Sequence, residues 1–255
     1  MQGVTEVVPV SSSAHLTALP WLLGWPAVPD RTTFASGLHA GSCLGIAVAL
    51  SRAERPAAPP GPGSTTAPGT SPRTYALAAA TCLPAAAAGL LAADAVEARL
   101  GRPDQLAWLL AGAGAALALA DRRPQDRSVG PREAALAALA QVAALAPGVS
   151  RSGAALTALR AGRVGRTEAE RFSLLMSLPV TAGAAALTLA RSDPAQRAAL
   201  AAPLAVGVPA AAVSAFAVVR LRARRGAHPV FTFALYRLAL AAVVLGTSRR
   251  RRDRP

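Results

Sequence analysis

The sequence predicts an all-α integral membrane protein with about six transmembrane helices plus two re-entrant helical hairpins. The first observation behind this prediction is composition: of 255 residues, 53% are hydrophobic and only 16% are charged. A soluble domain carries roughly 25% charged residues. The second observation is that the apolar residues gather in long runs without charge. We therefore expect one polytopic membrane domain over residues 1–255, and the apolar content excludes a disordered chain.

Six apolar runs are long enough, or nearly so, to cross a bilayer, which takes about 20 residues in a helix. They are Phe34 to Leu50, Thr74 to Ala93, Gln105 to Ala120, Phe172 to Ala190, Ala198 to Val219 and Pro229 to Gly246. The last is interrupted only by Arg237, and the first contains His39. A soluble alanine-rich bundle would need a charged outer face on each helix, and these runs have none.

Two further apolar stretches predict broken helices. They cover Val4 to Pro29 and Ala134 to Thr157, and each has a proline break and a serine-rich turn between two apolar halves. Irregular backbone at membrane depth is tolerated only where protein or a water-filled cavity satisfies it. Because paired broken helices mark binding sites in membrane proteins built from repeats, we expect the site between these hairpins.

The polar segments predict surface features. Residues 51–73 are rich in Pro, Gly, Ser and Thr and indicate a flexible loop, and residues 248–255 form a basic tail suited to anionic lipid headgroups. Arginine clusters at 220–225 and 249–254 flank one predicted span, so the positive-inside rule gives no orientation. No basic segment precedes the first apolar run, so we expect no cleavable signal peptide.

Net charge and cysteine content narrow the function classes. The charge of +14 suits nucleic acid, an anionic membrane surface or a phosphorylated substrate. Aromatic residues make up only 4%, which argues against a nucleic-acid partner that stacks its bases on the protein. Cys43 and Cys82 are the only cysteines and both lie in apolar runs, which excludes a disulfide-stapled secreted fold.

The first hairpin carries a cluster of polar side chains. Gln2 and Glu6 are four residues apart and share one helical face, and Pro9 ends that helix. The break that follows contains Ser11, Ser12, Ser13 and His15. A carboxylate inside a membrane is costly and usually functional, so we favour a catalytic cluster. The alternative is a helix cap with a histidine reaching the membrane surface.

The second hairpin carries a candidate anion site. Gly148 and Gly153 let the backbone approach a ligand, Ser150 and Ser152 offer hydroxyls, and a helix restarting there would aim its N–H groups at an anion. Arg151 supplies a forked, permanent charge that suits phosphate. The alternative is an interfacial arginine beside a serine cap. Together the two clusters predict hydrolysis of a phosphoanhydride carried by a lipid.

These motifs resemble those of a known family. Residues 2–15, QGVTEVVPVSSSAH, resemble the first signature of the undecaprenyl-diphosphate phosphatase (bacitracin-resistance) family, and residues 147–154, PGVSRSGA, resemble its second. Residues 34–41, residues 171–175 and Tyr236-Arg237 are similar to further family stretches. The resemblance implies a multi-pass helical enzyme of the bacterial cell membrane with inverted repeats. It also implies conversion of undecaprenyl diphosphate, a polyprenyl diphosphate lipid, to undecaprenyl phosphate for peptidoglycan synthesis.

The resemblance also implies roles for individual residues. The catalytic set is Glu6, Ser12, His15 and Arg151. The substrate-binding set is Ser11, Ser13, Gly148, Ser150, Ser152 and Gly153. A divalent cation, Mg or Ca, would be held by Glu6 and Gln2, and a homodimer is possible. The chain departs from the family pattern at Ala155, where threonine is usual, with Thr157 as a candidate replacement.

Two other functions remain open at this point. A polyprenyl-phosphate transporter or flippase on the same inverted-repeat fold would need the anion site but not Glu6 or His15. A membrane scaffold without activity would tolerate alanine at every polar position. Phosphate release in detergent, where no gradient exists, separates the enzyme from both.

Overall fold

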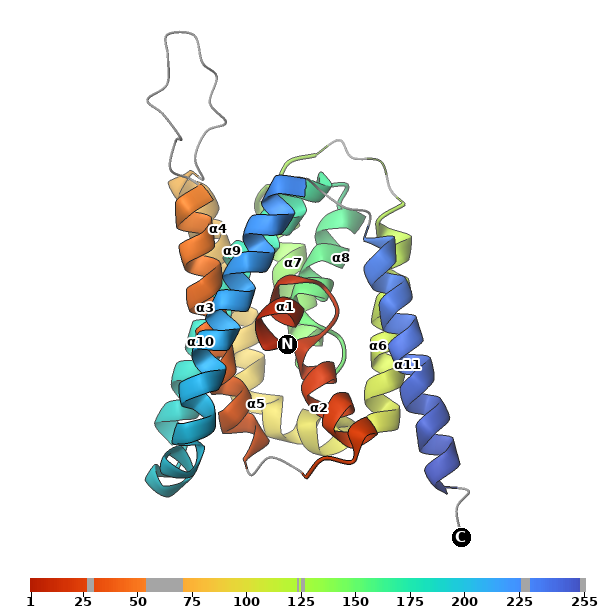
Figure 1. Ribbon diagram of the computed structural model, residues 1–255. Coiled ribbons are helices and arrows are strands. Elements are labelled where there is room, and N and C mark those ends of the chain that lie inside the picture. Colours follow the sequence, from red (N-terminus) through yellow and green to blue (C-terminus); the bar gives the residue numbers. More distant parts are fainter. Residues whose placement is uncertain (27–29, 54–70, 123, 125–126, 226–229, 253–255) are drawn as a thin grey trace.

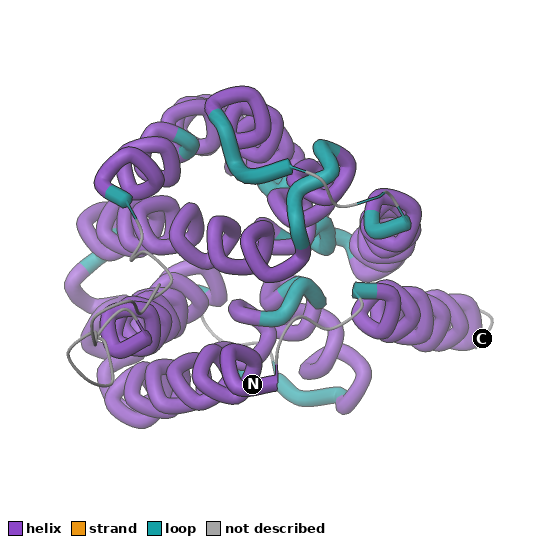
Figure 2. Tube along the Cα trace, turned by 90° about the horizontal axis from the view of Figure 1, so that it is seen from above, coloured by secondary structure: helices purple, strands orange, loops and turns teal. Residues whose placement is uncertain are grey.

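The computed structural model describes residues 1–26, 30–53, 71–122, 124, 127–225 and 230–252. In this part of the chain the secondary structure is helical, apart from an isolated bridge between Arg127 and Val164. The helices are α1 (Gln2–Val7), α2 (Ser12–Leu23), α3 (Arg31–Ala53), α4 (Pro72–Ala80), α5 (Cys82–Leu100), α6 (Pro103–Ala120), α7 (Pro131–Ala143), α8 (Arg151–Ala161), α9 (Arg166–Arg191), α10 (Pro194–Arg225) and α11 (Phe231–Arg252). Figures 1 and 2 show them as a bundle, which confirms the all-α prediction.

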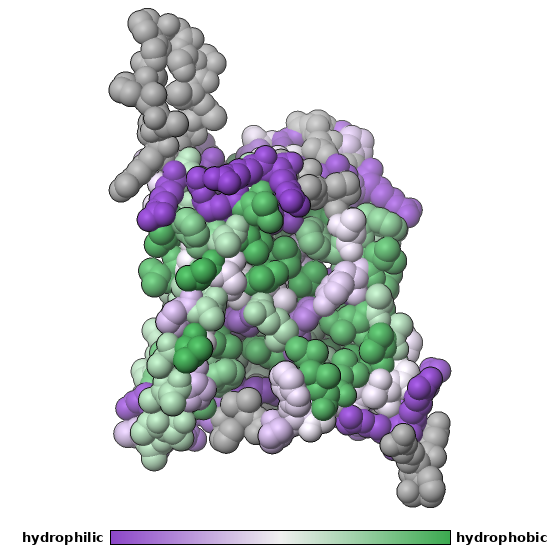
Figure 3. Space-filling model, viewed as in Figure 1, coloured by the Kyte–Doolittle hydropathy of each residue, from purple (hydrophilic) through white to green (hydrophobic). Residues whose placement is uncertain are grey.

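Five helical segments in the described residues are long and apolar enough to cross a membrane. They are Arg31–Ala53, Pro72–Ala93, Arg166–Arg191, Pro194–Arg225 and Phe231–Arg251. Figure 3 shows an apolar band around the middle of the bundle, with hydrophilic residues towards both ends. The protein is therefore a multi-pass membrane protein. Helix α6, the sixth expected span, has 18 residues and is not among the five, so the count of six stays a prediction.

The predicted span Thr74 to Ala93 corresponds to the apolar helical segment Pro72–Ala93, although Thr81 divides it between α4 and α5. Helix α5 continues to Leu100 because its charged last turn is still a good helix former. The expected loop 51–73 is shorter, since α3 reaches Ala53 and α4 begins at Pro72; residues 54–70 lie outside the described part. The basic tail is helical to Arg252, and residues 253–255 lie outside the described part.

Glycines allow two long helices to pack closely. Gly37, Gly41 and Gly45 form a stripe on α3 that faces α10. A Cβ at Gly41 would lie 2.4 Å from the carbonyl oxygen of Val208, and one at Gly45 would lie 2.1 Å from that of Ala212. Small residues spaced by four bring membrane helices into backbone contact in this way. The backbones of α3 and α10 are therefore in direct contact along this stripe.

The two predicted broken helices are both present. Helix α1 ends at Val7 and α2 begins at Ser12, while α7 ends at Ala143 and α8 begins at Arg151. Short α1 packs on α3 and α10, and α8 packs on α6, α7 and α9. Figure 1 shows α1 and the N-terminus at about half the height of the bundle. The chain thus places both breaks inside the bundle, while their re-entry into the bilayer stays a prediction.

Candidate active site

The two helix breaks have the same backbone geometry. Ser11 and Ser150 each have φ = 72°, a value rare for any residue but glycine, and each is the N-cap of the helix that follows. Ser11 Oγ accepts from the N–H of Ala14 at 3.3 Å, and Ser150 Oγ accepts from the N–H of Gly153 at 3.1 Å. Strained backbone of this kind gathers at functional sites, because only the surrounding structure can hold it.

Neighbouring serines repeat the same pattern. Ser13 Oγ lies 3.1 Å from Ser11 Oγ, and Ser152 Oγ lies 3.3 Å from Ser150 Oγ. Each break therefore presents a pair of hydroxyls at a helix N-terminus, where free N–H groups favour anions. Their role in substrate binding stays a prediction.

Glu6 is the centre of the polar cluster. Its carboxylate is buried on α1, and its Oε2 accepts hydrogen bonds from Ser12 Oγ at 2.9 Å and from Gln2 Nε2 at 3.1 Å. The contact with Ser12 spans the first helix break, so the hydroxyl at the start of α2 points back to α1. This geometry places a proton acceptor directly on the candidate nucleophile.

Arg151 brings the second break to the same carboxylate. One guanidinium nitrogen, Nη2, donates to Glu6 Oε1, and the other, Nη1, donates to Thr181 Oγ1 on α9 at 2.7 Å. The two clusters, expected at one site, meet here although 145 residues separate Glu6 from Arg151. The buried carboxylate and the partly buried guanidinium thereby each have a charged hydrogen-bond partner inside the apolar bundle.

His39 belongs to this cluster and was missing from the predicted site residues. Its Nδ1 lies 3.0 Å from Glu6 Oε2, 2.9 Å from Gln2 Nε2 and 3.5 Å from Arg151 Nη2. Thr181 was missed as well. The signal in the sequence was that each is a polar residue inside a long apolar run, and such residues in membrane spans usually face the interior of the bundle.

His15 has other partners. Its Nδ1 lies 2.7 Å from the carbonyl oxygen of Ser11, which only accepts, so Nδ1 carries the hydrogen. In the neutral ring Nε2 then accepts from the hydroxyl of Tyr236 on α11, at 2.7 Å, and the two rings stack with 5.6 Å between centroids. His15 follows Ser12 by three residues on α2, but Ser12 hydrogen-bonds to Glu6 whereas His15 hydrogen-bonds to Tyr236.

Comparison with known proteins decides the family. A family model described as "Bacitracin resistance protein BacA" matches residues 1–243. The chain belongs to this family. It is 37% identical over 258 residues to the undecaprenyl-diphosphatase of Geobacter metallireducens, covering 96% of this chain and 94% of that protein. It is 39% identical over 263 residues to the undecaprenyl-diphosphatase of Geobacter sulfurreducens, which covers 96% of this chain and 94% of that protein. It is 37% identical over 256 residues to the undecaprenyl-diphosphatase of Gemmatimonas aurantiaca, which covers 97% of this chain and 94% of that protein.

The glycines of the second break make room for protein in this BacA-family chain. Gly148 has φ = 99°, and a Cβ there would lie 2.6 Å from the carbonyl oxygen of Leu106 on α6. A Cβ at Gly153 would lie 2.6 Å from Nη1 of Arg237. The departure from the family pattern at Ala155 is buried in the apolar core, and Thr157 donates to the Gly153 carbonyl at 2.7 Å.

The residues present fit a hard divalent cation only in part. Gln2 Oε1 is buried without a hydrogen-bond partner and lies on the same face as the Glu6 carboxylate, and oxygen donors suit Mg²⁺ or Ca²⁺. No group of three His, Cys, Asp or Glu able to hold a metal occurs among the described residues. A cation at Gln2 and Glu6 would therefore need further oxygens from a phosphate and from water.

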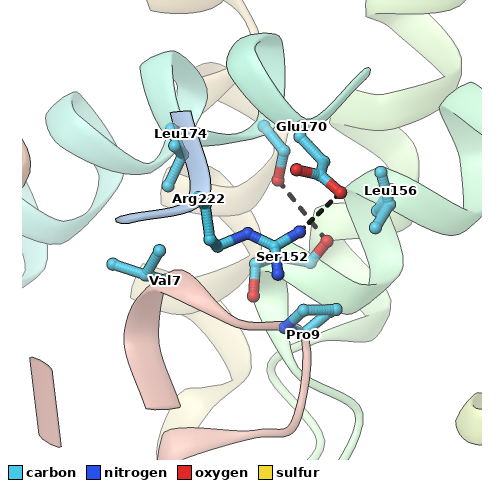
Figure 4. Close-up of a pocket in the computed structure, with 8 residues that line it drawn as sticks. Val7, Pro9, Ser152, Leu156, Glu170, Leu174 and Arg222 are labelled. Atoms are coloured by element: carbon cyan, nitrogen blue, oxygen red, sulfur yellow. Dashed lines mark hydrogen bonds and ion pairs between the residues drawn. The ribbon is translucent and has the colours of Figure 1, made fainter. Parts of the chain in front are cut away.

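Two cavities lie near the breaks. One of about 640 Å³ is lined by Met1, by α2 residues such as Leu16 and Trp21, and by Phe34 of α3. The other holds about 20 Å³, roughly one water, and lies between the two breaks, lined by Val7 and Pro9 at the first and by Ser152 at the start of α8. Figure 4 shows Arg222 and Glu170 of α10 and α9 paired across it, beside Ser152. Space for a large ligand thus lies on the α2 side of the breaks.

Acidic and basic residues also pair at the loop end of α6. Asp121 follows α6 and accepts from Arg160 Nε at 2.8 Å and from Arg166 Nη2 at 2.8 Å, which ties α6 to α8 and α9. Burial alone would raise the pKa of the Asp121 carboxyl, but these guanidinium contacts outweigh it and hold the pKa below its ordinary value. This cluster fixes the far end of α8, the helix that begins at Arg151.

Proposed function

We propose that this BacA-family protein hydrolyses undecaprenyl diphosphate to undecaprenyl phosphate and inorganic phosphate at the Glu6–Arg151 site. The reaction recycles the lipid carrier for peptidoglycan synthesis and confers resistance to bacitracin. The observation that carries the proposal is the contact of Arg151 with Glu6, which brings a proton acceptor and a phosphate-binding cation together inside an apolar bundle. The relatives named undecaprenyl-diphosphatase align with 96% of this chain and over 94% of their own length.

Substrate binding uses the two helix breaks. The diphosphate takes the place of Glu6 on one arm of the Arg151 fork, while the other arm stays on Thr181. The N-termini of α2 and α8 add N–H groups and partial positive charge on either side. Ser11, Ser13, Ser150 and Ser152 offer hydroxyls to the phosphates at these two N-termini, and Gly148 and Gly153 allow the tight turn of the second break to pack against α6 and Arg237.

Glu6 and Ser12 carry the first chemical step. Glu6 Oε2 takes the proton of the Ser12 hydroxyl, 2.9 Å away, and Oγ attacks the terminal phosphorus as the bond to the bridging oxygen breaks. Undecaprenyl phosphate leaves with the electron pair. Water then attacks the phosphoserine, the P–Oγ bond breaks, and Oγ takes back the proton held by Glu6 as inorganic phosphate leaves. In the variant without a phosphoserine, Glu6 deprotonates a water that attacks the terminal phosphorus directly. His15 in its doubly protonated form gives the leaving phosphate oxygen the proton of Nε2, the nitrogen that otherwise accepts from Tyr236, while Nδ1–H stays on the Ser11 carbonyl.

A divalent cation, Mg or Ca, would be held by Glu6 and Gln2 together with substrate oxygens. When bound, it neutralises charge on the diphosphate. The lipid chain has space in the cavity of about 640 Å³ between α2 and α3, whose lining is mainly apolar. In this proposal the protein lies in the bacterial plasma membrane, in contact with membrane lipids. A homodimer is its proposed assembly, and no nucleic-acid partner is expected.

A transporter of polyprenyl phosphates is the second candidate function. It would need a path for the headgroup past the breaks, but the cavity between the two breaks holds only about 20 Å³ and is bordered by the Arg222–Glu170 pair. The deciding experiment measures phosphate release by purified protein in detergent with Mg²⁺ or Ca²⁺, using undecaprenyl and shorter polyprenyl diphosphates. Release that Glu6→Gln abolishes supports the phosphatase, and lipid binding without release would overturn it.

A further inference from the structure

Arg237 is a charged residue whose contacts have no part in the mechanism above. It lies on α11 and its side chain is fully buried, with 0% of its surface exposed. Its Nε donates to the carbonyl oxygen of Leu110 on α6 at 3.2 Å, and its Nη1 donates to that of Pro9 at 3.4 Å. Its Nη2 donates to the carbonyl oxygens of Gly148 at 3.0 Å and Val149 at 2.8 Å.

These acceptors occupy equivalent positions in the two breaks. Pro9 stands two residues before Ser11, and Gly148 stands two residues before Ser150, the two serines with φ = 72°. One guanidinium therefore ties together the backbone that precedes both strained N-caps. A planar group with donors fixed in a fork can reach both carbonyls at once, whereas the compact ammonium group of lysine cannot.

The surrounding residues are built around this side chain. A Cβ at Gly153 would lie 2.6 Å from Arg237 Nη1, and one at Gly114 would lie 3.2 Å from Arg237 Cβ, so both glycines leave room for the Arg237 side chain. No carboxylate pairs with Arg237 among the described residues. An unpaired buried charge is costly, and the carbonyl oxygens of the breaks are what stabilise it. Removing it would leave those carbonyls without their donor.

We propose that Arg237 is a positioning residue that holds the two helix breaks in register, so that Ser12 from one and Arg151 from the other meet at Glu6. The inference rests on the proposed function for its kinetic consequence. Arg237 does not touch substrate, because its side chain is enclosed by backbone of α6 and of both breaks. It acts by fixing the separation of the N-termini of α2 and α8.

The kinetic test is chemical rescue of Arg237→Ala, which leaves a guanidinium-sized space lined by carbonyl oxygens. Phosphate release should fall at least tenfold, and millimolar guanidinium chloride should restore part of it, whereas methylammonium chloride at equal ionic strength should not. The matched control is Arg160→Ala, since Arg160 is equally buried but holds Asp121 at the far end of α8. Turnover per folded Arg160→Ala molecule should match wild type.

A second measurement does not depend on activity. With both native cysteines replaced by alanine, spin labels at the exposed positions Val4 and Leu139, on α1 and α7, report the distance between the hairpins. Arg237→Ala should broaden the distance distribution, and guanidinium should narrow it again. An unchanged distribution in folded Arg237→Ala protein would overturn the inference, as would a loss of turnover that guanidinium does not rescue. Failure of wild type to release phosphate would instead count against the proposed function alone.

Discussion

Ser12 Oγ lies 2.9 Å from Glu6 Oε2 across the first helix break, so the hydroxyl and its proton acceptor come from two different helices. The Pro9 break allows this contact, because a continuous helix would direct side chains six residues apart to different faces. This contact is why we propose Glu6 as the general base and, with Gln2, as the cation ligand.

Glu6→Gln should lower turnover by about 10²–10⁴, the range for losing an acid–base group. The amide keeps a hydrogen bond to Ser12 but takes up no proton. The same variant should raise the cation concentration needed for half-maximal activity, because an amide is a weaker ligand than a carboxylate for Mg²⁺ or Ca²⁺. Phosphate release titrated with each metal checks both effects, and wild-type turnover in Glu6→Gln would remove the base assignment.

Arg151→Lys should lower kcat/KM at least about tenfold, which corresponds to roughly 1.4 kcal/mol of transition-state stabilisation. Arginine holds Thr181 with one arm and Glu6 or phosphate with the other, and lysine keeps the charge without the fork. Steady-state kinetics on detergent-solubilised protein measure the loss. A lysine variant with wild-type kcat/KM would show that charge alone suffices.

Sequence periodicity and motif spacing predicted the helical class, both breaks and one site shared by the two polar clusters, but not the contact between Glu6 and Arg151. They could not predict His39 or Tyr236 as partners, because these contacts depend on how α3 and α11 pack against the breaks. The hydrogen-bond partner of His15 could not be predicted either. His15 lies three residues from Ser12 on one helix, but the partner of each side chain depends on which polar groups the neighbouring helix places beside it.

Asp121→Asn should lower the thermal stability at neutral pH by at least about 6 °C. Breaking a buried ion pair costs about 3–5 kcal/mol, and each kcal/mol lowers Tm by about 2–4 °C in a chain of this size. The pKa of Asp121 is lower in the folded state than its ordinary 3.8, so its contribution is present above that pH and is lost as pH falls below it. The difference between variant and wild type should therefore shrink at pH 3.

The control for this prediction is Asp104→Asn. Asp104 pairs at 3.3 Å with Arg102, whose side chain is 65% exposed, and exposed pairs contribute about 0–1 kcal/mol. Melting curves in one detergent at pH 7 and pH 3 compare the variants. Equal Tm values for Asp121→Asn and wild type at pH 7 would contradict a stabilising role for the cluster at the end of α6.

The roles of the two site histidines can be separated by pH. His15→Ala should lower turnover by about 10²–10⁴ and remove one limb of the pH–rate profile, because its imidazole is the proposed proton donor. His39→Gln should cost less than tenfold and keep both limbs, since a glutamine amide can still donate to Glu6 where His39 Nδ1 now lies 3.0 Å away. Metal affinity should stay near normal in His15→Ala, whose side chain contacts Tyr236 and Ser11 and not Glu6.

Tyr236→Phe serves as the matched control for the proton path. It removes the hydroxyl 2.7 Å from His15 Nε2 but keeps the stacked ring, so it should shift the histidine limb of the profile while leaving the fold intact. The profiles of kcat and kcat/KM for all three variants, from pH 5 to pH 9, decide between the two histidines. If the limb disappears in His39→Gln and persists in His15→Ala, then His39, which contacts Glu6, is the proton donor, and His15 only holds α2 against α11.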